Sequence, residues 1–503
     1  MPAIRPFDES GIVRGSDGVA HYQGLQPSLV AMLRSSVEQS PHAEAIVEAG
    51  GARITYRELW DRSAEIAGGL RELGIERGDR VAIRLANGLD WCLAFFGSQL
   101  AGAIAVPVNT RFSESEMEYV VTDSGSKFVC LPGASLPRGP SLAVDDLSPG
   151  DVSAIFYTSG TTGFPKGAMT THEGFLSNVE TCRRIFPLPF DGTLRTLISV
   201  PLFHVTGCNS QLLPTCAGRG TTVIMPQFDV QAFLKLIPEE RINSLVSVPA
   251  IFWLAINQPN FSEIDTSSVR WLCYGGAPIA PDLIARILEA FPTARVGNGF
   301  GLTETTSVAT FLPHDYSRLR PETVGFAAPV VDLKLDEDGF ESGVGELLIR
   351  GPNIVKGYWN KPEATAETFA GGWLHSGDLA RLDEQGFVQI VDRKKDMVNR
   401  GGENVYCVEV ENALAAHPAV FEVAVVGVPD EMMGEKVGAV IVLKPQKEAD
   451  DVRNLLDFAR ERLADFKVPQ YLVIRREALP RNPGGKILKK HLREEVAWGP
   501  AVS

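Results

Sequence analysis

Segments typical of β-strands and of α-helices alternate along the first 110 residues, and this alternation constrains the fold more than any other feature. An apolar run at AEAIVE (43–48) precedes TYRELWDRSAEIAGGLRELG (55–74), and the pattern repeats through DRVAIRL, LDWCLAFFGSQLAG and AIAVPV. Such alternation predicts parallel sheet covered by helices. Further apolar runs follow at RTLISV (195–200), TTVIMP (221–226) and NSLVSVP (243–249). We therefore expect one large α/β body of mixed, mostly parallel sheets.

The end of the chain has a different composition and predicts a second, smaller domain. At 503 residues the chain exceeds the size at which a single hydrophobic core stops growing. Residues 391–406, VDRKKDMVNRGGENVY, are strongly charged and then glycine-rich, as boundaries between domains often are. Beyond them, the sequence predicts strands at EVAVVGV, GAVIVLK and QYLVIR and a helix at DVRNLLDFARERLADF (451–466), which is the pattern of a small α+β domain.

The overall charge argues against nucleic acid as a partner. A net charge of −14 and a pI near 5.2 oppose broad contact with a phosphate backbone. From Lys467 to Arg493, however, eight Lys or Arg residues accompany a single acid, Glu477. The C-terminal end is therefore able to bind an anion.

Cysteine usage and hydropathy predict a cytoplasmic protein without a transmembrane segment. Seven cysteines occur without a C-x-x-C pair, so we expect buried thiols in a reducing compartment rather than disulfides or a zinc site. The first 25 residues lack the hydrophobic core of a signal peptide. The longest apolar stretch, FFGSQLAGAIAVPV (95–108), is shorter than a membrane span and contains Gly and Pro.

One segment, YTSGTTGFPKG (157–167), combines three glycines and four Ser or Thr side chains with a single lysine. It follows the strand-like VSAIFY (152–157) and precedes THEGFLSNVETCRRIF (171–186), a predicted helix with Thr171 as its N-cap. A strand, a glycine-rich loop and a helix would direct backbone N–H groups and hydroxyls at a phosphate, with Lys166 offsetting its charge. The common P-loop spacing is absent. The segment therefore predicts a phosphate loop of another kind, and a structural turn is the alternative.

Six motifs in this order resemble those of the AMP-forming acyl-CoA synthetase family, which also includes luciferases and the adenylation domains of peptide synthetases. The resemblance extends from about residue 27 to residue 495 and rests on YTSGTTGFPKG, PLFHVTG (201–207), YGGAP (274–278), NGFGLTET (298–305), WLHSGD (373–378) and DRKKDMVNRGGENV (392–405). It implies a domain organisation in four parts. These are a polar extension (1–26), a large AMP-binding and acyl-substrate domain (27–392), a hinge (393–396) and a small mobile C-terminal lid (397–503).

The resemblance also implies where ATP binds. It assigns the β- and γ-phosphates to the glycine-rich loop, the α-phosphate to Thr303, Mg²⁺ to Glu304, the ribose to Asp378 and a further nucleotide contact to Arg393. The implied nucleotide-binding residues are Thr158, Ser159, Gly160, Thr161, Thr162, Gly163, Lys166, Gly276, Ala277, Pro278, Asn298, Gly299, Phe300, Gly301, Thr303, Asp378, Arg393 and Lys486.

The residue types suit these roles. Glycines let the backbone lie against a purine face, a carboxylate is a hard oxygen ligand for Mg²⁺, and the two oxygens of Asp378 can accept from both ribose hydroxyls. The chain departs from the family at Phe300, where Tyr is common, and at Ser376, where Thr is usual. A solvated surface lysine is the alternative for Lys166, and a turn-capping carboxylate is the alternative for Asp378.

For the acid and the thiol, the resemblance implies a second set of residues. It places His204 at the mouth of an acyl pocket, Lys395 at the hinge, and Gly401 and Gly402 along the tunnel for the thiol of coenzyme A. The implied acyl pocket comprises His204, Val205, Val248, Phe252, Gly275 and Gly301. A packed residue at a strand end is the alternative for His204, and Lys394 is expected only to be solvated.

The implied reaction has two steps, with ATP and coenzyme A as co-substrates and Mg²⁺ as cofactor. A carboxylate oxygen leaves poorly, so the acid is first joined to the α-phosphate of ATP, and a thiol then displaces AMP. The first step joins an anion to a polyanion, and Mg²⁺ at Glu304 with Lys166 and Lys486 would neutralise the developing charge. The catalytic residues would be Lys486, His204, Glu304 and Thr303. Turning of the lid about Lys395 would then withdraw Lys486.

The candidate acid-binding segments, 205–213, 246–256 and 301–309, contain neither Lys nor Arg. Relatives that take malonate carry an arginine where this chain has Leu254. A second carboxylate would stay unpaired in an apolar cavity, which is costly. We therefore expect an apolar monocarboxylic acid, fatty or aromatic, as the small-molecule partner.

Several alternatives stay open from the sequence alone. The protein could be an acyl-AMP ligase that serves a carrier protein, a luciferase-type oxygenase, or a catalytically silent sensor of ATP or acyl-AMP. An amino-acid adenylation domain would need an aspartate near PLFHVTG, where this chain has none. Peripheral contact with a membrane and a monomeric or homodimeric state also stay open.

Overall fold

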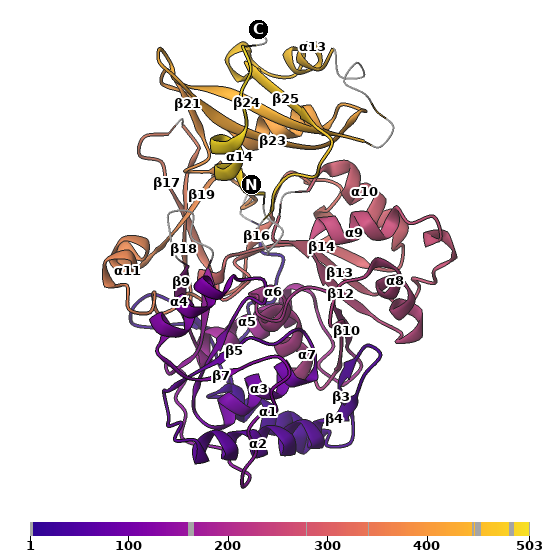
Figure 1. The fold of residues 1–503 in the computed structure, drawn as a ribbon, viewed down its shortest axis with the longest axis vertical. Helices are drawn as coiled ribbons and strands as arrows, with labels where there is room; N and C mark the ends of the chain where they lie inside the picture. Colours follow the sequence, from indigo (N-terminus) through magenta and orange to yellow (C-terminus); the bar gives the residue numbers. More distant parts are fainter. Residues whose placement is uncertain are drawn as a thin grey trace. The chain divides into compact units, whose positions relative to one another are not determined.

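The chain divides into two compact units in the computed structural model. The model describes residues 4–158, 165–277, 279–340, 342–444, 447, 454–481 and 487–501. Unit 1 consists of Met1–Leu333, Ile349–His375 and Glu384–Phe387, and unit 2 consists of Lys334–Leu348, Ser376–Asp383 and Val388–Ser503. Figure 1 shows the elements of both units.

The largest sheet of unit 1 has nine strands. Six neighbouring strands run parallel, and short antiparallel strands pair at both edges. The order is β16 (Phe326–Ala327), β15 (Thr310–Leu312), β14 (Arg295–Phe300), β13 (Trp271–Gly275), β12 (Ser244–Ser247), β10 (Arg195–Ile198), β11 (Thr221–Ile224), β3 (Glu44–Glu48) and β4 (Arg53–Thr55). This arrangement confirms the predicted α/β body of mostly parallel sheet.

A second sheet of unit 1 has five strands and includes the two described ends of the glycine-rich segment, at Thr158 and Lys166. Its order is β7 (Ser126–Cys130), β5 (Arg80–Ile83), β6 (Ile104–Pro107), β8 (Val152–Thr158) and β9 (Lys166–Thr171). The predicted passage from strand through loop to helix is wrong at one point, because the antiparallel strand β9 comes between loop and helix. The backbone of β9 also bonds to the segment 356–359, a partner far along the chain that a local pattern does not reveal.

The helices of unit 1 follow the predicted periodicity. Helix α2 (Tyr56–Glu72) begins with a capping box in which Thr55 and Glu58 satisfy each other's backbone N–H groups. The Thr171 side chain accepts from Gly174 N at 3.0 Å and caps α5 (His172–Ile185), as predicted. The others are α1 (Leu29–Gln39), α3 (Leu89–Leu100), α4 (Glu114–Ser124), α6 (Val205–Gly207), α7 (Leu213–Ala217), α8 (Val230–Glu239), α9 (Pro249–Ile256), α10 (Pro281–Ala290) and α11 (Pro362–Thr368).

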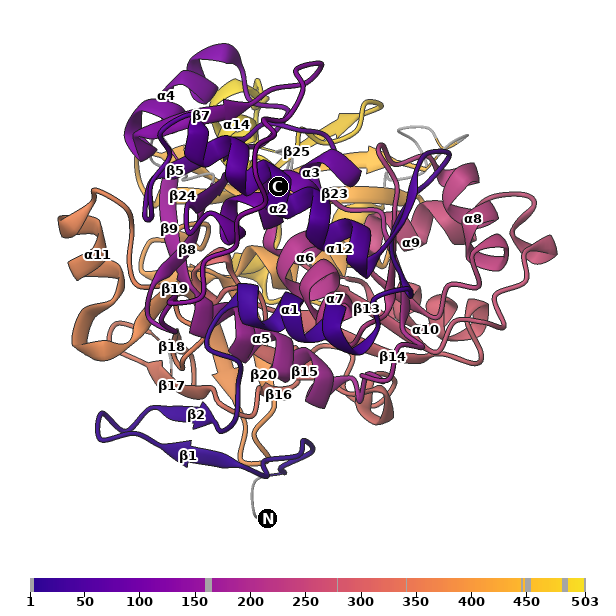
Figure 2. The same ribbon diagram turned by 90° about the horizontal axis from the view of Figure 1, so that it is seen from below.

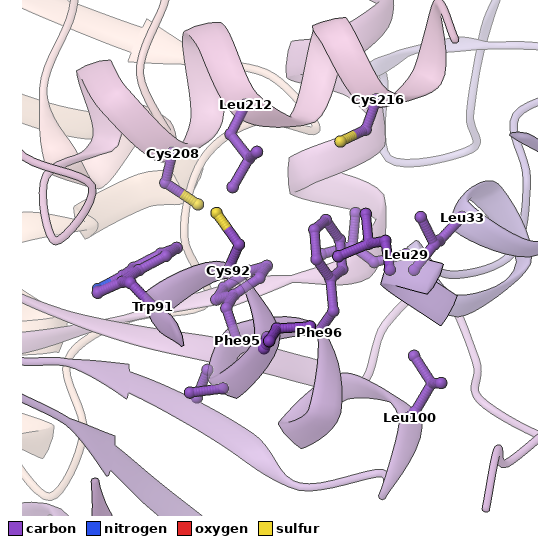
Figure 3. Packing of buried hydrophobic residues seen from close by; sticks show 14 of the residues in the cluster. Leu29, Leu33, Trp91, Cys92, Phe95, Phe96, Leu100, Cys208, Leu212 and Cys216 are labelled. Carbon is purple, nitrogen blue, oxygen red and sulfur yellow. The ribbon is translucent and has the colours of Figure 1, made fainter. Parts of the chain in front are cut away.

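Two apolar clusters hold these helices against the sheets. Every residue of helix α3 except Asp90 is buried, and Trp91 stacks on Phe95 with ring centroids 5.3 Å apart. Figure 3 shows this cluster, in which Cys92 of α3 points toward Cys208. Helices α8, α9 and α10 lie together along β12, β13 and β14 (Figures 1 and 2), where Phe252 and Phe291 are fully buried.

The polar N-terminal segment is an integral part of unit 1. It forms the hairpin of β1 (Ile12–Arg14) and β2 (Ala20–Tyr22), whose strands lie side by side in Figure 2. Tyr22 is buried and donates to or accepts from the Thr181 hydroxyl at 2.9 Å, and the Arg14 guanidinium pairs with Asp332 at 2.8 Å. The hairpin therefore packs as part of the fold.

Unit 2 contains the predicted small α+β domain. Its five-stranded sheet comprises β22 (Glu403–Val405), β21 (Val398–Arg400), β24 (Gly434–Leu443), β23 (Val420–Asp430) and β25 (Tyr471–Arg475). Its helices are α12 (Cys407–Ala415), α13 (Leu455–Arg460) and α14 (Lys489–Glu495). The helix predicted over 451–466 is shorter within the described residues, since α13 ends at Arg460 and Ala464 is extended.

A further sheet has four strands. Its order is β17 (Asp332–Asp336), β18 (Gly345–Arg350), β19 (Leu374–Leu382) and β20 (Val388–Arg393).

All seven cysteines are free, and six of them are buried, as predicted from their spacing. Among the described residues, no helix combines the length and the apolar character that crossing a bilayer requires.

Candidate active site

Four neighbouring parallel strands bring the predicted acyl and adenine segments to one edge of the nine-stranded sheet. Gly275 and Phe300 are the last residues of β13 and β14, Val248 follows β12 directly, and His204 lies six residues beyond the end of β10. The carboxyl ends of parallel strands are the usual binding edge of such sheets. The fold therefore brings these four predicted residues, with Gly301, to a single edge of unit 1.

Close backbone packing requires two of the predicted glycines. A Cβ atom on Gly275 would lie 2.1 Å from the carbonyl oxygen of Gly299, and one on Gly301 would lie 1.5 Å from that of Ser307. Both distances are far inside van der Waals contact, so no other residue fits without backbone movement. These glycines shape the site, whether or not a purine lies against them.

The predicted acyl-pocket residues differ in burial. Val205 and Phe252 are buried, and the Phe252 ring lies 6.4 Å from that of Phe291 in the core of unit 1. His204, Val248, Gly275 and Gly301 are partly exposed. Leu254 is 39% exposed on another face of α9 from Phe252. A ligand at the sheet edge can therefore reach the partly exposed residues more directly than the buried Val205 and Phe252.

His204 begins a short helical segment. Its imidazole Nδ1 accepts from Thr206 N at 3.4 Å and so caps α6, which continues into a π-helical turn, Cys208–Leu212. Such turns are frequent at functional sites. The entry turn is tight, because a Cβ atom on Gly207 would lie 2.4 Å from the Pro201 carbonyl oxygen. Capping fixes the imidazole ring at the sheet edge. His204 can therefore be both a structural residue at the end of a strand and the predicted residue at the mouth of the acyl pocket.

Two of the predicted phosphate-binding residues of the glycine-rich segment, Thr158 and Lys166, are register partners on neighbouring antiparallel strands. Thr158 ends β8, Lys166 begins β9, and the Thr158 hydroxyl lies 3.4 Å from the Lys166 carbonyl oxygen. The Lys166 ammonium lies 5.1 Å from the ring centroid of Tyr358, within the range of a cation–π interaction. Lys166 therefore has a defined position. The predictions for Ser159, Gly160, Thr161, Thr162 and Gly163, like those for Pro278 and Lys486, fall outside the described residues.

Thr303 and Glu304 lie in a 3₁₀ turn, Thr303–Thr305, directly after β14. The Glu304 carbonyl accepts from Val355 N at 2.9 Å, and its carboxylate Oε1 accepts from the Tyr358 hydroxyl at 2.7 Å. Burial, reinforced by this carboxylate, raises the pKa of Tyr358, so the phenol stays protonated at neutral pH. Tyr358 is thus a site residue that the sequence motifs did not reveal.

Buried asparagines support this turn in a strained conformation. Thr306 has φ +58° and is fully buried, although β-branched residues rarely adopt that conformation. Asn209 donates to the Thr306 carbonyl at 2.6 Å, and Thr306 donates to the Asn353 carbonyl at 2.6 Å. The Asn353 amide in turn donates to Thr305 O at 3.0 Å. Strain held this firmly is typical of functional sites.

In unit 2, the two predicted nucleotide residues form an ion pair. Asp378 on β19 and Arg393 on β20 are register partners, and Arg393 Nε lies 2.6 Å from Asp378 Oδ1. Asp378 is 2% exposed, and its backbone N–H donates to the Ser376 hydroxyl at 3.1 Å. Ser376 therefore supports the turn that presents Asp378, a role its hydroxyl shares with that of threonine.

Lys394 is solvated, as expected, but it also has a partner within unit 2. Its ammonium donates to Glu346 Oε2 at 2.9 Å, while Glu346 Oε1 accepts from Gly377 N at 2.9 Å. Gly377 has φ +71°, and its carbonyl accepts from Lys394 N at 2.9 Å. Glu346 thereby joins the turn before Asp378 to the segment after Arg393, a contact that the charge run alone did not reveal.

The predicted hinge and thiol-tunnel residues follow within unit 2. Lys395 is the second residue after β20 and is exposed. Gly401 and Gly402 form the two-residue turn between β21 and β22, with φ +61° and +95°. This conformation is typical of type I′ hairpins, which strongly favour glycine. Their turn is thus explained by backbone geometry, and their proposed contact with coenzyme A stays a prediction.

A further ionic cluster in unit 2 joins helix α14 to helix α12, near the end of β20. Lys489 Nζ lies 2.7 Å from Glu411 Oε1, with side-chain exposures of 16% and 15%. Asp392 is buried and accepts from the backbone N–H groups of Arg393 and Cys407. Burial raises the pKa of Asp392 to about 7, against the opposing effect of Lys489. Lys489 is three residues after Lys486, so this cluster holds the segment that follows the predicted catalytic lysine.

The described residues fit Mg²⁺ only if substrate phosphates supply part of its ligand set. Among them, no three His, Cys, Asp or Glu side chains gather into a metal cluster. The carboxylate of Glu304 has a neutral phenol as its hydrogen-bond donor, so it keeps its negative charge for an external cation. Mg²⁺ usually binds through one or two carboxylates together with substrate phosphates, which matches this arrangement.

Comparisons with known proteins identify the family of this chain. The family model for AMP-binding enzymes matches residues 33–138 and 130–359, and that for the AMP-binding enzyme C-terminal domain matches 409–486. The chain is 36% identical to the long-chain-fatty-acid–CoA ligase FadD13 of Mycobacterium tuberculosis, covering 93% of this chain and 98% of that protein. It is 37% identical to the feruloyl-CoA synthase of an Amycolatopsis species, covering 90% and 96%.

A solved structure is also similar. The o-succinylbenzoate coenzyme A synthetase MenE of Bacillus subtilis, in complex with ATP and a magnesium ion, matches with a TM-score of 0.83 and 28% identity. The match covers 93% of this chain and 100% of that one. The family resemblance inferred from the six motifs is thereby confirmed. The chain belongs to the AMP-binding enzyme family, as an AMP-forming acyl-CoA synthetase.

Proposed function

We propose that this synthetase activates an apolar monocarboxylic acid, fatty or aromatic, at the carboxyl edge of the nine-stranded sheet in unit 1. One observation carries the proposal. The three segments that the fold brings to this edge, 205–213, 246–256 and 301–309, contain no Lys or Arg. A second carboxylate would therefore lose its hydration there without gaining a partner. The names of the fatty-acid and feruloyl relatives support the same class of acid.

The reaction uses ATP, Mg²⁺ and coenzyme A and proceeds in two steps. The acid displaces pyrophosphate from ATP to give acyl-AMP, and the thiol of coenzyme A then displaces AMP to give the thioester. Forming the adenylate brings two anions together, so cations must be present where negative charge accumulates. AMP leaves far more readily than the oxygen of a free carboxylate, which makes the second displacement possible.

The residue roles follow from chemistry and position. Lys166 would offset the charge of the departing pyrophosphate, with the hydroxyl of Thr158 beside it, and Glu304 would hold Mg²⁺ when it is bound with ATP. Thr303 would donate to the α-phosphate from the turn that carries Glu304. His204 would lie where the acid enters. Lys486 would contact the acid and the α-phosphate during adenylation.

Unit 2 would supply the remaining nucleotide contacts and the mobile part. Asp378 would accept from the ribose hydroxyls while Arg393 holds one of its carboxylate oxygens in place. Turning about Lys395, within a hinge over 393–396, would exchange Lys486 for the turn at Gly401 and Gly402 when the thiol enters. A cytoplasmic location and a monomeric or homodimeric state complete the proposal, and the seven free cysteines suit a reducing compartment.

Pyrophosphate release over a panel of acids tests the substrate class. Octanoate and cinnamate should give kcat/KM values about tenfold or more above those of malonate and succinate, because an unpaired buried carboxylate costs more than ~1.4 kcal/mol. Lys486→Ala serves as a control that should fail with every acid. Comparable values for malonate and octanoate would contradict the proposed substrate class.

The same assay separates the alternative activities. Acyl-AMP that accumulates and is not discharged by coenzyme A would indicate an acyl-AMP ligase that serves a carrier protein. Absence of pyrophosphate release with every acid would indicate a sensor.

A further inference from the structure

The geometry points to Tyr358 as a positioning residue that fixes the Glu304 carboxylate and the Lys166 ammonium relative to each other for binding magnesium and the ATP phosphates. The inference rests on the proposed roles of Glu304 and Lys166. Tyr358 follows Gly357 in the sequence GYWNK and belongs to none of the six motifs. A single side chain therefore connects two motifs that are 138 residues apart in the sequence.

The hydroxyl and the ring of Tyr358 make different contacts. The hydroxyl donates to Glu304 Oε1 at 2.7 Å, a distance typical of a strong hydrogen bond to a carboxylate. The ring has the Lys166 ammonium 5.1 Å from its centroid. An aromatic face attracts a cation without neutralising it. Tyr358 can thus orient an anion and a cation while leaving both charges available to a bound ligand.

The surroundings of Tyr358 leave it little freedom. It is 7% exposed, and its ring lies 5.6 Å from that of Phe369. Its backbone N–H donates to the Thr365 hydroxyl at 2.9 Å, and the next residue, Trp359, donates to Gly167 O at 2.7 Å. The first bond ties Tyr358 to α11 and the second ties it to β9. The tyrosine is therefore fixed by backbone as well as by side-chain packing.

Glu304 is joined to the same segment a second time. Its carbonyl oxygen accepts from Val355 N at 2.9 Å, three residues before Tyr358. The turn between the two residues needs Gly357, which has φ +126° and whose Cβ would lie 2.6 Å from the Thr365 side chain. Main chain and side chain of Glu304 are thus held by one five-residue segment, 355–359. Such support from outside the ligand set commonly sets ligand orientation in metal sites.

A neutral donor is the chemically suitable partner for a carboxylate that must bind an external cation. An arginine or lysine at this distance would compete with Mg²⁺ for the carboxylate. A phenol orients one oxygen of Glu304 and leaves its charge in place. Tyr358→Phe removes only the hydroxyl and keeps the ring next to Lys166, whereas Tyr358→Leu removes both, so the two contacts can be tested separately.

The test is calorimetric titration of the full-length protein with α,β-methylene-ATP, which cannot form acyl-AMP, over a series of Mg²⁺ concentrations. Tyr358→Phe should raise the Mg²⁺ concentration that gives half-maximal affinity about tenfold, the usual loss for a hydrogen bond to a charged group. Saturating Mg²⁺ should restore its affinity for the nucleotide. Tyr358→Leu should also weaken nucleotide binding at saturating Mg²⁺, because Lys166 loses the ring.

The matched control is Tyr22→Phe. Tyr22 is another buried tyrosine of unit 1 that lies outside the six motifs, and its hydroxyl forms a hydrogen bond with the Thr181 hydroxyl at 2.9 Å. This variant should lower stability without changing the Mg²⁺ concentration that gives half-maximal affinity. An equal shift in Tyr22→Phe would show general loosening and would overturn the inference, as would a Tyr358→Phe titration that superimposes on the parent curve.

Glu304→Gln separates the positioning role of Tyr358 from the metal-binding role of Glu304. If it raises the Mg²⁺ midpoint while Tyr358→Phe does not, only the positioning role is wrong. If neither variant raises it, the proposed metal role of Glu304 fails as well.

Discussion

In each unit of this synthetase, burial holds one titratable side chain toward its neutral form, and that side chain is a base in unit 1 and an acid in unit 2. Unit 1 encloses His172, a base at the start of α5 whose Nδ1 accepts from Leu29 N at 3.3 Å. Unit 2 encloses Asp392, an acid at the end of β20, near the largely buried pair of Glu411 and Lys489. Burial favours the neutral form in both cases, so it lowers the pKa of the histidine and raises that of the aspartate. The units should therefore respond to pH in opposite directions.

The comparison also extends to two glutamates. Glu304 of unit 1 accepts from a neutral phenol, whereas Glu411 of unit 2 accepts from Val425 N at 2.8 Å and pairs with Lys489. Burial alone would lower the pKa of Lys489, but the Glu411 carboxylate raises it overall. A carboxylate with its own internal cation serves the fold, and one with a neutral donor is available to a ligand.

The largest expected effect is on the internal cation of unit 2. Lys489→Met leaves Glu411 largely buried without its partner and should lower the free energy of unfolding of unit 2 by about 2 to 4 kcal/mol. Protection of the β23 and β24 amides in native-state hydrogen exchange measures this loss for unit 2 separately. The matched control is Lys490→Met, whose side chain is 69% exposed and 3.8 Å from Glu494, and which should change little.

A second replacement sharpens this test. Adding Glu411→Leu to Lys489→Met should recover most of the lost protection, since apolar replacements of both partners are often tolerated. If the double variant is as unstable as the sum of the two single variants, the cluster does not act as an ion pair.

The next effect is the pH response of Asp392. Its pKa is near 7 in the folded state and near 3.8 when unfolded, so the folded state binds the extra proton between these values. Stability of unit 2 therefore falls as pH rises through this window, by about 2 to 3 kcal/mol between pH 5 and pH 8. Asp392→Asn keeps one acceptor oxygen and should largely remove the fall in β24 protection.

Glu477→Gln is the control for this experiment, because Glu477 belongs to the same unit and is 86% exposed. Its pH profile should match that of the parent protein. A profile of Asp392→Asn that still falls as steeply as the parent's would show that another group of unit 2 titrates in this range.

The sequence predicted those features of the fold that depend on neighbours along the chain. Helix α2 was expected over 55–74 and spans Tyr56–Glu72, and Thr171 caps α5 through its own hydroxyl. Strand β9 was missed although its main partner is the neighbouring strand β8, because KGAMTT has no alternating apolar pattern and its other edge bonds to residues 356–359, about 190 positions away. Local periodicity does not contain information about such a partner.

The candidate site likewise contains residues that the sequence predicted and residues that only the fold revealed. The motifs pointed to His204, Glu304 and Asp378, because each belongs to a short run of characteristic residues. Tyr358 and Asn353 were missed, since their contacts with the 303–306 turn cross about 50 residues and a lone tyrosine or asparagine has no distinctive neighbours. Residues that bind a ligand directly form recognisable runs, whereas residues that support them are identified only by the fold.

The smallest of these effects should appear in unit 1 on acidification. Burial lowers the pKa of His172 to about 4, below the value of 6.5 expected for the unfolded chain. The unfolded state then binds the extra proton between these values, so stability is complete above pH 6.5 and is lost as pH falls toward 4. Between pH 7 and pH 5 the loss should be about 2 kcal/mol, seen as reduced protection of the α5 amides.

His172→Gln should flatten this pH dependence, with lower stability near pH 7, whereas substitution of the exposed His42 by Gln should leave the pH dependence unchanged. Unit 2 is expected to become more stable between pH 7 and pH 5. A larger loss of amide protection in β24 than in α5 over this interval would therefore contradict the opposite pH responses proposed for the two units.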